Sequence, residues 1–187
     1  MEVEVKIAVE SLEPYERRAE ALQYTVRRPF HFEANTLFDF PERALLHTGC
    51  LLRVRETPAG GVLTFKGKVV QHDHYKVRPE HETPCADPAA MREILQSLGL
   101  TAFFRYEKYR EEYRAEGAVL CLDELPFGAF LELEGSPEGI EALAAALALD
   151  RAAFNKRSYA DLYAENCRKE GKPFGDIVFG RGGDGCP

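Results

Sequence analysis

Hydrophobic and polar residues alternate along much of this chain, in runs of strand length. In the first nine residues, Val3, Val5 and Ile7 take every second position, and charged residues fill most of the places between them. A period of two is typical of a strand with one buried face. Alternation, aromatic-rich runs and turn signals such as Gly60-Gly61 predict further strands at 30–40, 50–57, 62–69, 75–83, 103–114, 119–124 and 129–134.

Helical spacing of apolar residues occurs between these strands. The pattern predicts helices near 12–22, 41–48, 87–99, 136–147 and 157–169. Two of the starts are well marked, because Asp87 and Ser136 can each cap a helix and each is followed by proline. Connections of hairpin length dominate between the strands. The chain is therefore predicted to be an α+β protein with seven or eight strands in an antiparallel sheet.

The charges on the polar strand faces are sorted by sign. Like charges recur two residues apart in the pairs Glu2/Glu4, Arg53/Arg55, Lys66/Lys68, Glu80/Glu82, Lys108/Arg110 and Glu132/Glu134. One such pair alone is typical of an ordinary solvent-facing strand, but a face built for solubility would mix the signs. If the helices cover the apolar faces from outside, the charged faces must point inward. A closed barrel with a polar lumen satisfies both requirements.

Buried charges are costly unless they are paired or hold a charged ligand. Lys and Arg side chains can bind the oxygens of a polyphosphate, and Asp and Glu oxygens can hold Mg²⁺ or Mn²⁺ ions that bridge its phosphates. These groups together also support phosphoryl transfer, which depends mainly on positioning and charge neutralisation. The sequence thus predicts a barrel that binds a triphosphate with divalent metal ions.

Composition excludes several other classes of protein. The 187 residues include 24 basic and 31 acidic side chains, and the net charge of −7 argues against a general nucleic-acid binder. No apolar run is long enough to span a membrane, and the acidic N-terminus is unlike a secretory signal. Five widely spaced cysteines without a Cys-x-x-Cys pair are interpreted as reduced thiols of a cytoplasmic protein.

The chain is predicted to form one domain over residues 1–165 and a glycine-rich, flexible tail over 166–187. The tail contains a G-x-G-x-x-G match at Gly180, Gly182 and Gly185. It is not a dinucleotide site, because that motif needs a strand before it and a helix after it.

At this point the sequence resembles a known family, the CYTH domain proteins, also called triphosphate tunnel metalloenzymes, and within it the class IV adenylyl cyclase-like branch. The resemblance covers roughly residues 1–163. It rests on motifs that occur in the family's order, namely Glu2-x-Glu4-x-Lys6, Arg53-x-Arg55, Leu63-Thr64-Phe65-Lys66-Gly67, Arg78-x-Glu80-x-Glu82, Lys108-x-Arg110, Asp123-Glu124, Gly128-x-Phe130-x-Glu132-x-Glu134 and Ser158-Tyr159.

The resemblance implies a closed, eight-stranded antiparallel tunnel with helices packed outside. It implies metal sites lined by Glu2, Glu4, Asp123, Glu132 and Glu134. It implies phosphate contacts from Lys6, Arg53, Arg55, Lys66, Lys108 and Arg110, with Arg78 as a further phosphate ligand. The candidate catalytic residues are Lys6, Arg53, Lys66, Arg110 and Glu80; Glu80 could balance charge or orient a water.

Three functions remain open. The first is a metal-dependent enzyme that either hydrolyses a triphosphate or cyclises ATP to cyclic AMP and pyrophosphate; candidate substrates are ATP, tripolyphosphate and thiamine triphosphate. The second is a module that binds polyphosphate or a nucleotide without turnover. The third is a structural barrel without a ligand, which the sorted charges disfavour. The sequence leaves monomer and homodimer open.

Overall fold

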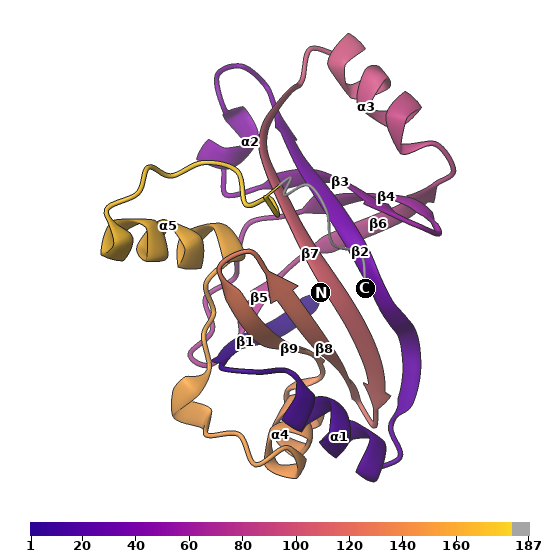
Figure 1. The fold of residues 1–187 in the computed structure, drawn as a ribbon. Helices are drawn as coiled ribbons and strands as arrows, with labels where there is room; N and C mark the ends of the chain where they lie inside the picture. The colour runs from indigo at the N-terminus through magenta and orange to yellow at the C-terminus, as the bar shows by residue number, and fades with distance from the viewer. Residues whose placement is uncertain (181–187) are drawn as a thin grey trace.

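The computed structural model describes residues 1–180, and its centre is an antiparallel β-barrel (Figure 1). Its strands are β1 (Glu2–Val9), β2 (Thr25–Asp39), β3 (Leu51–Thr57), β4 (Gly60–Lys66), β5 (Lys76–Arg78), β6 (Glu80–Cys85), β7 (Thr101–Ala115), β8 (Ala118–Leu125) and β9 (Gly128–Gly135). Its helices are α1 (Glu13–Ala21), α2 (Ala44–His47), α3 (Pro88–Ser97), α4 (Pro137–Ala146), a 3₁₀ turn (Arg151–Ala153) and α5 (Tyr159–Glu170).

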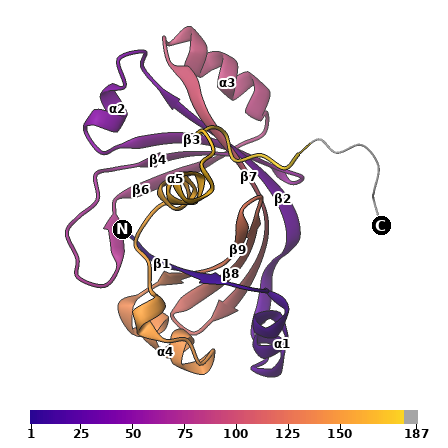
Figure 2. The ribbon, with the colours of Figure 1, turned by 60° about the vertical axis from the view of Figure 1, so that its left-hand side comes forward.

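The sheet curls into a nearly closed barrel, and one proline connects its two edge strands. The strand order is β5-β1-β9-β8-β7-β2-β3-β4-β6, so the two terminal strands of the sheet, β5 and β6, are consecutive in the chain and separated only by Pro79. The sequence predicted a single strand here. Proline has no N–H to donate, so the ladder breaks at this residue. β5 then pairs with β1 and β6 with β4, which gives nine strands where eight were predicted. Figure 2 shows β4 and β6 side by side and the strands curving around the interior.

The apolar faces of the strands point outward and are covered by helices. Leu120, Leu131 and Leu133 form a buried core with Ile140 and Leu143 of α4. A smaller core joins β2 and β3 to α3. The predicted caps form as expected, because the Asp87 side chain accepts a hydrogen bond from the Ala90 N–H and the Ser136 side chain from the Gly139 N–H, both at 3.0 Å. With the outer faces covered, the charged faces line the interior.

One end of the barrel is packed with apolar side chains from α5 and the segment after it. Leu37, Phe104 and Tyr159 form a buried cluster there with Ile177, whose N–H donates to the Arg105 carbonyl at 2.9 Å. The predicted domain boundary at residue 165 falls inside α5, and Ile177 beyond this helix is buried against β7. The reason is that β8 pairs with β7 only from Tyr109 onward, so the edge near Tyr106 has room for Ile177. Gly182 and Gly185 lie outside the described residues.

None of the helices in the described part of the chain is long and apolar enough to cross a membrane.

Candidate active site

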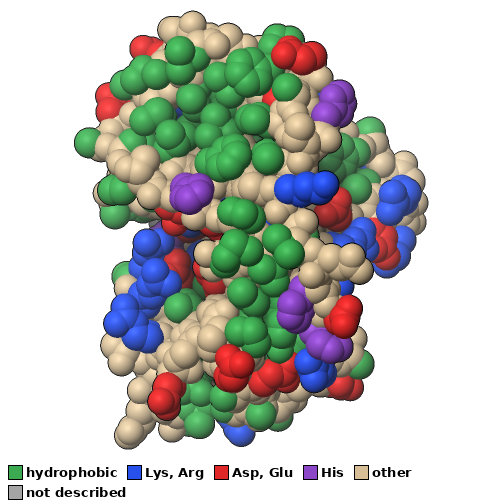
Figure 3. All heavy atoms as spheres, turned by 180° about the vertical axis from the view of Figure 1, so that it is seen from behind, with side chains coloured by type: hydrophobic (Ala, Val, Ile, Leu, Met, Phe, Trp, Pro, Cys, Tyr) green, Lys and Arg blue, Asp and Glu red, His purple; other side chains and the backbone are tan. Residues whose placement is uncertain are grey.

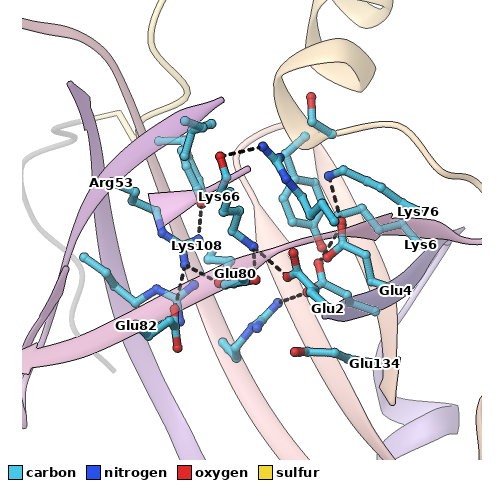
Figure 4. Close-up of a pocket in the computed structure, with 18 of the residues that line it drawn as sticks. Glu2, Glu4, Lys6, Arg53, Lys66, Lys76, Glu80, Glu82, Lys108 and Glu134 are labelled. Atoms are coloured by element: carbon cyan, nitrogen blue, oxygen red, sulfur yellow. Dashed lines mark hydrogen bonds and ion pairs between the residues drawn. The ribbon is translucent and has the colours of Figure 1, made fainter. Parts of the chain in front are cut away.

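A cavity inside the barrel is lined by the charged strand faces (Figure 4). The period-two pattern explains why: residues two apart on a strand share a face, so each sorted pair projects into the same space. The lining includes Glu2, Glu4, Lys6, Arg53, Arg55, Lys66, Lys76, Arg78, Glu80, Glu82, Lys108, Arg110, Glu132 and Glu134. The predicted site residues, apart from Asp123, therefore line one cavity.

The cations of the cavity are held by several acceptors at once. Arg53 donates through Nη2 to the Thr64 hydroxyl at 3.1 Å and to Glu82 at 3.2 Å, and through Nη1 to the Tyr106 hydroxyl at 3.0 Å. Lys66 Nζ lies 2.6 Å from Glu2 and 2.8 Å from Glu80. Such contacts fix these long side chains in place before any ligand arrives.

Asp123 is fully buried and lies among donors. Arg110 binds it through two nitrogens, Nε to Oδ1 at 2.6 Å and Nη2 to Oδ2 at 2.5 Å. Lys108 Nζ at 3.1 Å and the Tyr159 hydroxyl at 2.6 Å also contact Oδ2. In this arrangement Asp123 orients the side chains of Lys108 and Arg110, and its predicted part in a metal site stays a prediction.

The opposite wall, made by β1 and β9, carries an excess of carboxylates. Glu4 and Glu132 share Lys6, with Nζ 2.8 Å and 2.9 Å from their oxygens, and Lys76 adds a second contact to Glu4 at 2.8 Å. Burial would raise the pKa of Glu4, but the lysines bring it down to about 2. Glu134 differs. Burial and its neighbours Glu132 and Glu2 raise its pKa, and it has no ion pair among the described residues.

Three ligand-type side chains converge on this wall. One atom each of Cys121, Glu132 and Glu134 lie within 4.8 Å of one another. Glu134 has no ion pair among the described residues, whereas Glu132 beside it is paired with Lys6 and Arg110. An unpaired carboxylate next to a second one fits a divalent cation, because Mg²⁺ and Mn²⁺ prefer oxygen ligands. Glu2 and Glu4 add two more carboxylates of the predicted set from the neighbouring strand, which pairs Glu4 with Glu134, while Asp123 is bound by cationic side chains. The residues therefore suit the metals that the sequence predicted.

The comparisons with known proteins agree with this geometry. The profile of the CYTH domain matches residues 1–158. The chain belongs to the CYTH family. Its fold resembles a Pyrococcus horikoshii protein at 26% identity and a TM-score of 0.71, covering 89% of this chain and 99% of the other. A Vibrio parahaemolyticus protein provisionally assigned as an adenylate cyclase is 23% identical, with a TM-score of 0.78 and coverage of 87% and 97%.

A third similar structure is that of a Hippeastrum protein described as having a dominant triphosphatase activity. It is 21% identical to this CYTH protein, with a TM-score of 0.64 and coverage of 92% of this chain and 97% of the other. The Vibrio and Hippeastrum proteins are each less than 25% identical to this chain, so their similarity to it concerns the fold alone. The comparison with curated proteins found no match.

Two predicted residues of the CYTH protein have distinct surroundings. Burial and a hydrogen bond with Glu2 raise the pKa of Glu80 to about 8, although Lys66 acts in the opposite direction. Glu80 is thus able to exchange a proton near neutral pH. Arg78 donates instead to the backbone carbonyls of Gly49, Lys66 and Gly67. It holds the strand end beside Pro79, and its predicted phosphate contact stays a prediction.

Sequence reasoning missed several residues that line the cavity or contact its lining. Glu33 is fully buried on β2, with Arg55 Nη1 at 3.4 Å and Lys108 Nζ at 3.5 Å. Its signal was present, since Glu33 and Asn35 alternate with the apolar Phe32 and Ala34 on the predicted strand. Cys121 had a similar signal, two residues before Asp123. Arg27, Arg28 and Glu112 also line the cavity, and alternation alone could not have found the two arginines.

Proposed function

We propose that this CYTH protein is a metal-dependent triphosphatase that hydrolyses a triphosphate inside its barrel. The observation that carries the proposal is the division of one cavity into two walls. Carboxylates on β1 and β9 face lysines and arginines on β3, β4 and β7. A substrate with several negative charges and an accompanying divalent cation satisfies both walls at once.

Different residues of the cavity would bind the metal, bind the phosphates and accept the proton. Glu2, Glu4, Glu132 and Glu134 would hold the metal, which supplies charge neutralisation at the phosphates. Lys6, Arg53, Arg55, Lys66, Lys108 and Arg110 exchange carboxylate partners for phosphate oxygens. Water attacks the terminal phosphorus; the new P–O bond forms as the bridging P–O bond breaks. In its ionised form, Glu80 accepts the proton of the water, and its pKa of about 8 makes that form accessible near neutral to mildly basic pH.

Cyclisation of ATP is the second candidate, and one observation favours it. Leu37, Leu51 and Phe104 line the cavity at the end near α5, where a nucleobase would find apolar contacts. In that reaction the 3′-hydroxyl attacks the α-phosphorus and pyrophosphate leaves. Most of this apolar surface already packs against α5 and Ile177, with Leu37 6% and Phe104 8% exposed, which is why hydrolysis is preferred.

A product assay separates these functions. The purified protein is supplied with Mg²⁺ or Mn²⁺ and, in parallel, with tripolyphosphate, ATP and thiamine triphosphate. We expect orthophosphate, released fastest from one of the three, which would name the preferred substrate. Cyclic AMP and pyrophosphate from ATP would replace the hydrolase with the cyclase. Binding of a triphosphate without any product would leave a binding module, and no binding would contradict both enzymes.

A further inference from the structure

Two neighbouring arginines on β2 face the same buried carboxylate. Arg28 Nη1 donates to Glu112 Oε1 at 3.3 Å, and Arg27 Nε lies 3.6 Å from Glu112 Oε2. Consecutive residues of a regular strand point to opposite faces of the sheet. Both arginines nevertheless line the cavity. Something in the strand must therefore turn one of them inward.

The cause is an irregular stretch of β2. Its pairing with β7 shifts register between Val26 and Arg28 and again between Arg28 and His31, so Arg27 has no partner in the ladder. Such bulges redirect side chains and occur often beside active sites. The regular pairing of β2 with β7 is lost at this point, and both guanidinium groups lie on the cavity side.

These two guanidinium groups are more open than the cations deeper in the cavity. The side chains of Arg27 and Arg28 are 39% and 46% exposed, whereas those of Lys108 and Arg110 are 3% and 4% exposed. Within the described residues, the only hydrogen bond that the two groups make is the one from Arg28 to Glu112. Each guanidinium carries five N–H donors, so most of them are free to bind an anion.

The direction of the cavity shows which part of a ligand would reach them. Along the inner face of β7, Phe104 and Tyr106 are followed by Lys108, Arg110 and Glu112, and Arg28 lies opposite Glu112. The aromatic end is packed against α5 and Ile177. Another solvent-facing side chain of the lining, Glu82 at 44% exposure, repels phosphate. A phosphate chain too long to be bound by the central lysines and arginines alone can therefore extend toward Arg27 and Arg28. From behind, basic side chains gather beside a hollow where acidic ones are visible (Figure 3).

We propose that Arg27 and Arg28, held by Glu112, form an entrance site for the phosphate groups of an inorganic polyphosphate longer than three units. The inference rests on the proposed function, because it assumes that the central cations bind the first three phosphates. Glu112 keeps both guanidinium groups on the cavity side, and their free N–H groups bind the distal phosphate oxygens. The protein then binds long polyphosphate more tightly than tripolyphosphate.

The test is calorimetric binding of tripolyphosphate and of a longer polyphosphate to the full chain, in EDTA so that no turnover occurs. The variant is Arg27→Gln/Arg28→Gln, and the matched control is Arg17→Gln/Arg18→Gln, an adjacent pair on α1 that does not line the cavity. We expect the unaltered protein and the control to favour the longer chain, and the variant to lose about tenfold of that preference while binding tripolyphosphate nearly as before.

Each outcome has a definite meaning. An equal preference for the longer chain in the variant and the unaltered protein would overturn the entrance site, as would the absence of any such preference in the unaltered protein. Failure of the unaltered protein to bind tripolyphosphate both in EDTA and with Mg²⁺ present would instead overturn the proposed function, and the entrance site with it. Thermal unfolding of the variant and the control, measured in parallel, separates a loss of binding from a loss of folding, because Glu112 is buried and both arginines are its ion-pair partners.

Discussion

The two walls of the cavity differ in how their charges are satisfied. On the cationic wall, Arg53 and Arg110 each contact several acceptors, which hold them in place. On the carboxylate wall, Glu134 lacks an ion pair among the described residues and has a raised pKa. The first wall is preorganised, and the second carries negative charge that a cation would relieve. The difference makes the carboxylate wall, rather than the cationic wall, the place where a bound divalent cation would relieve an excess of like charge.

The largest expected effect comes from the carboxylate wall. The double change Glu4→Gln/Glu134→Gln removes two negative charges and preserves side-chain shape. If this wall holds the metal, turnover of the preferred triphosphate should fall by about a thousandfold, because a bound metal ion supplies several kcal/mol of transition-state stabilisation. Phosphate release at saturating Mg²⁺ or Mn²⁺ measures the loss.

The control for this change is Glu13→Gln on exposed α1, which should leave turnover unchanged. Binding of tripolyphosphate in EDTA should survive in the double variant, since the cationic wall is intact. Turnover within a few-fold of the unaltered protein would mean that these carboxylates do not hold the catalytic metal.

The second effect is a loss of stability, and it comes from the outward, apolar face of β9. Leu133 lies between Glu132 and Glu134 on β9 but points outward into the core under α4, where it is fully buried. Leu133→Ala should lower the free energy of unfolding by about 2–5 kcal/mol, the usual cost of a cavity in a core. Denaturant unfolding measures this loss. Turnover per folded molecule should be unchanged, and a large fall in it would show that the two faces are not independent.

Much of this division between faces could be predicted from the sequence. A period of two assigned Glu2, Glu4 and Lys6 to one face and Val3 and Val5 to the other, and the barrel keeps that assignment because each strand is regular there. The like-charge pairs then indicated a shared interior. Pro79 marked the irregular point in the ladder, although the sequence did not show that the two halves of that strand pair with different neighbours.

The rest depends on features that alternation does not encode. Arg27 and Arg28 both reach the cavity because β2 is irregular around them, so a strict period of two would place one of them outside. Ile177 pairs near Tyr106 because β8 leaves that edge of β7 free, a consequence of strand lengths in three dimensions. Local pattern predicts which face a residue takes, whereas bulges and strand lengths decide the exceptions.

The third effect tests the cationic wall. Arg53→Ala removes a guanidinium that contacts Thr64, Glu82 and Tyr106 inside the cavity. Affinity for tripolyphosphate should fall by about ten- to a hundredfold, as expected for the loss of hydrogen bonds to a charged group. Arg92→Ala, which breaks an ion pair with Glu56 outside the cavity, is the matched control. Calorimetry in EDTA would contradict the assignment if both variants bound equally well.

The smallest effect is a pH dependence of stability at the junction of the two walls. The folded protein holds a proton on Glu80 up to a pKa of about 8, well above the usual value of a glutamate. The folded state therefore binds the extra proton at pH 6, and this contribution to stability is lost as the pH rises through about 8. Without metal, the midpoint temperature of thermal unfolding should fall between pH 6 and pH 9, and Glu80→Gln should reduce that fall.

Glu82→Gln is the control, because the lowered pKa of Glu82 leaves it ionised throughout this range. An equal shift in the unaltered protein and the Glu80 variant would mean that the proton is held elsewhere on the carboxylate wall.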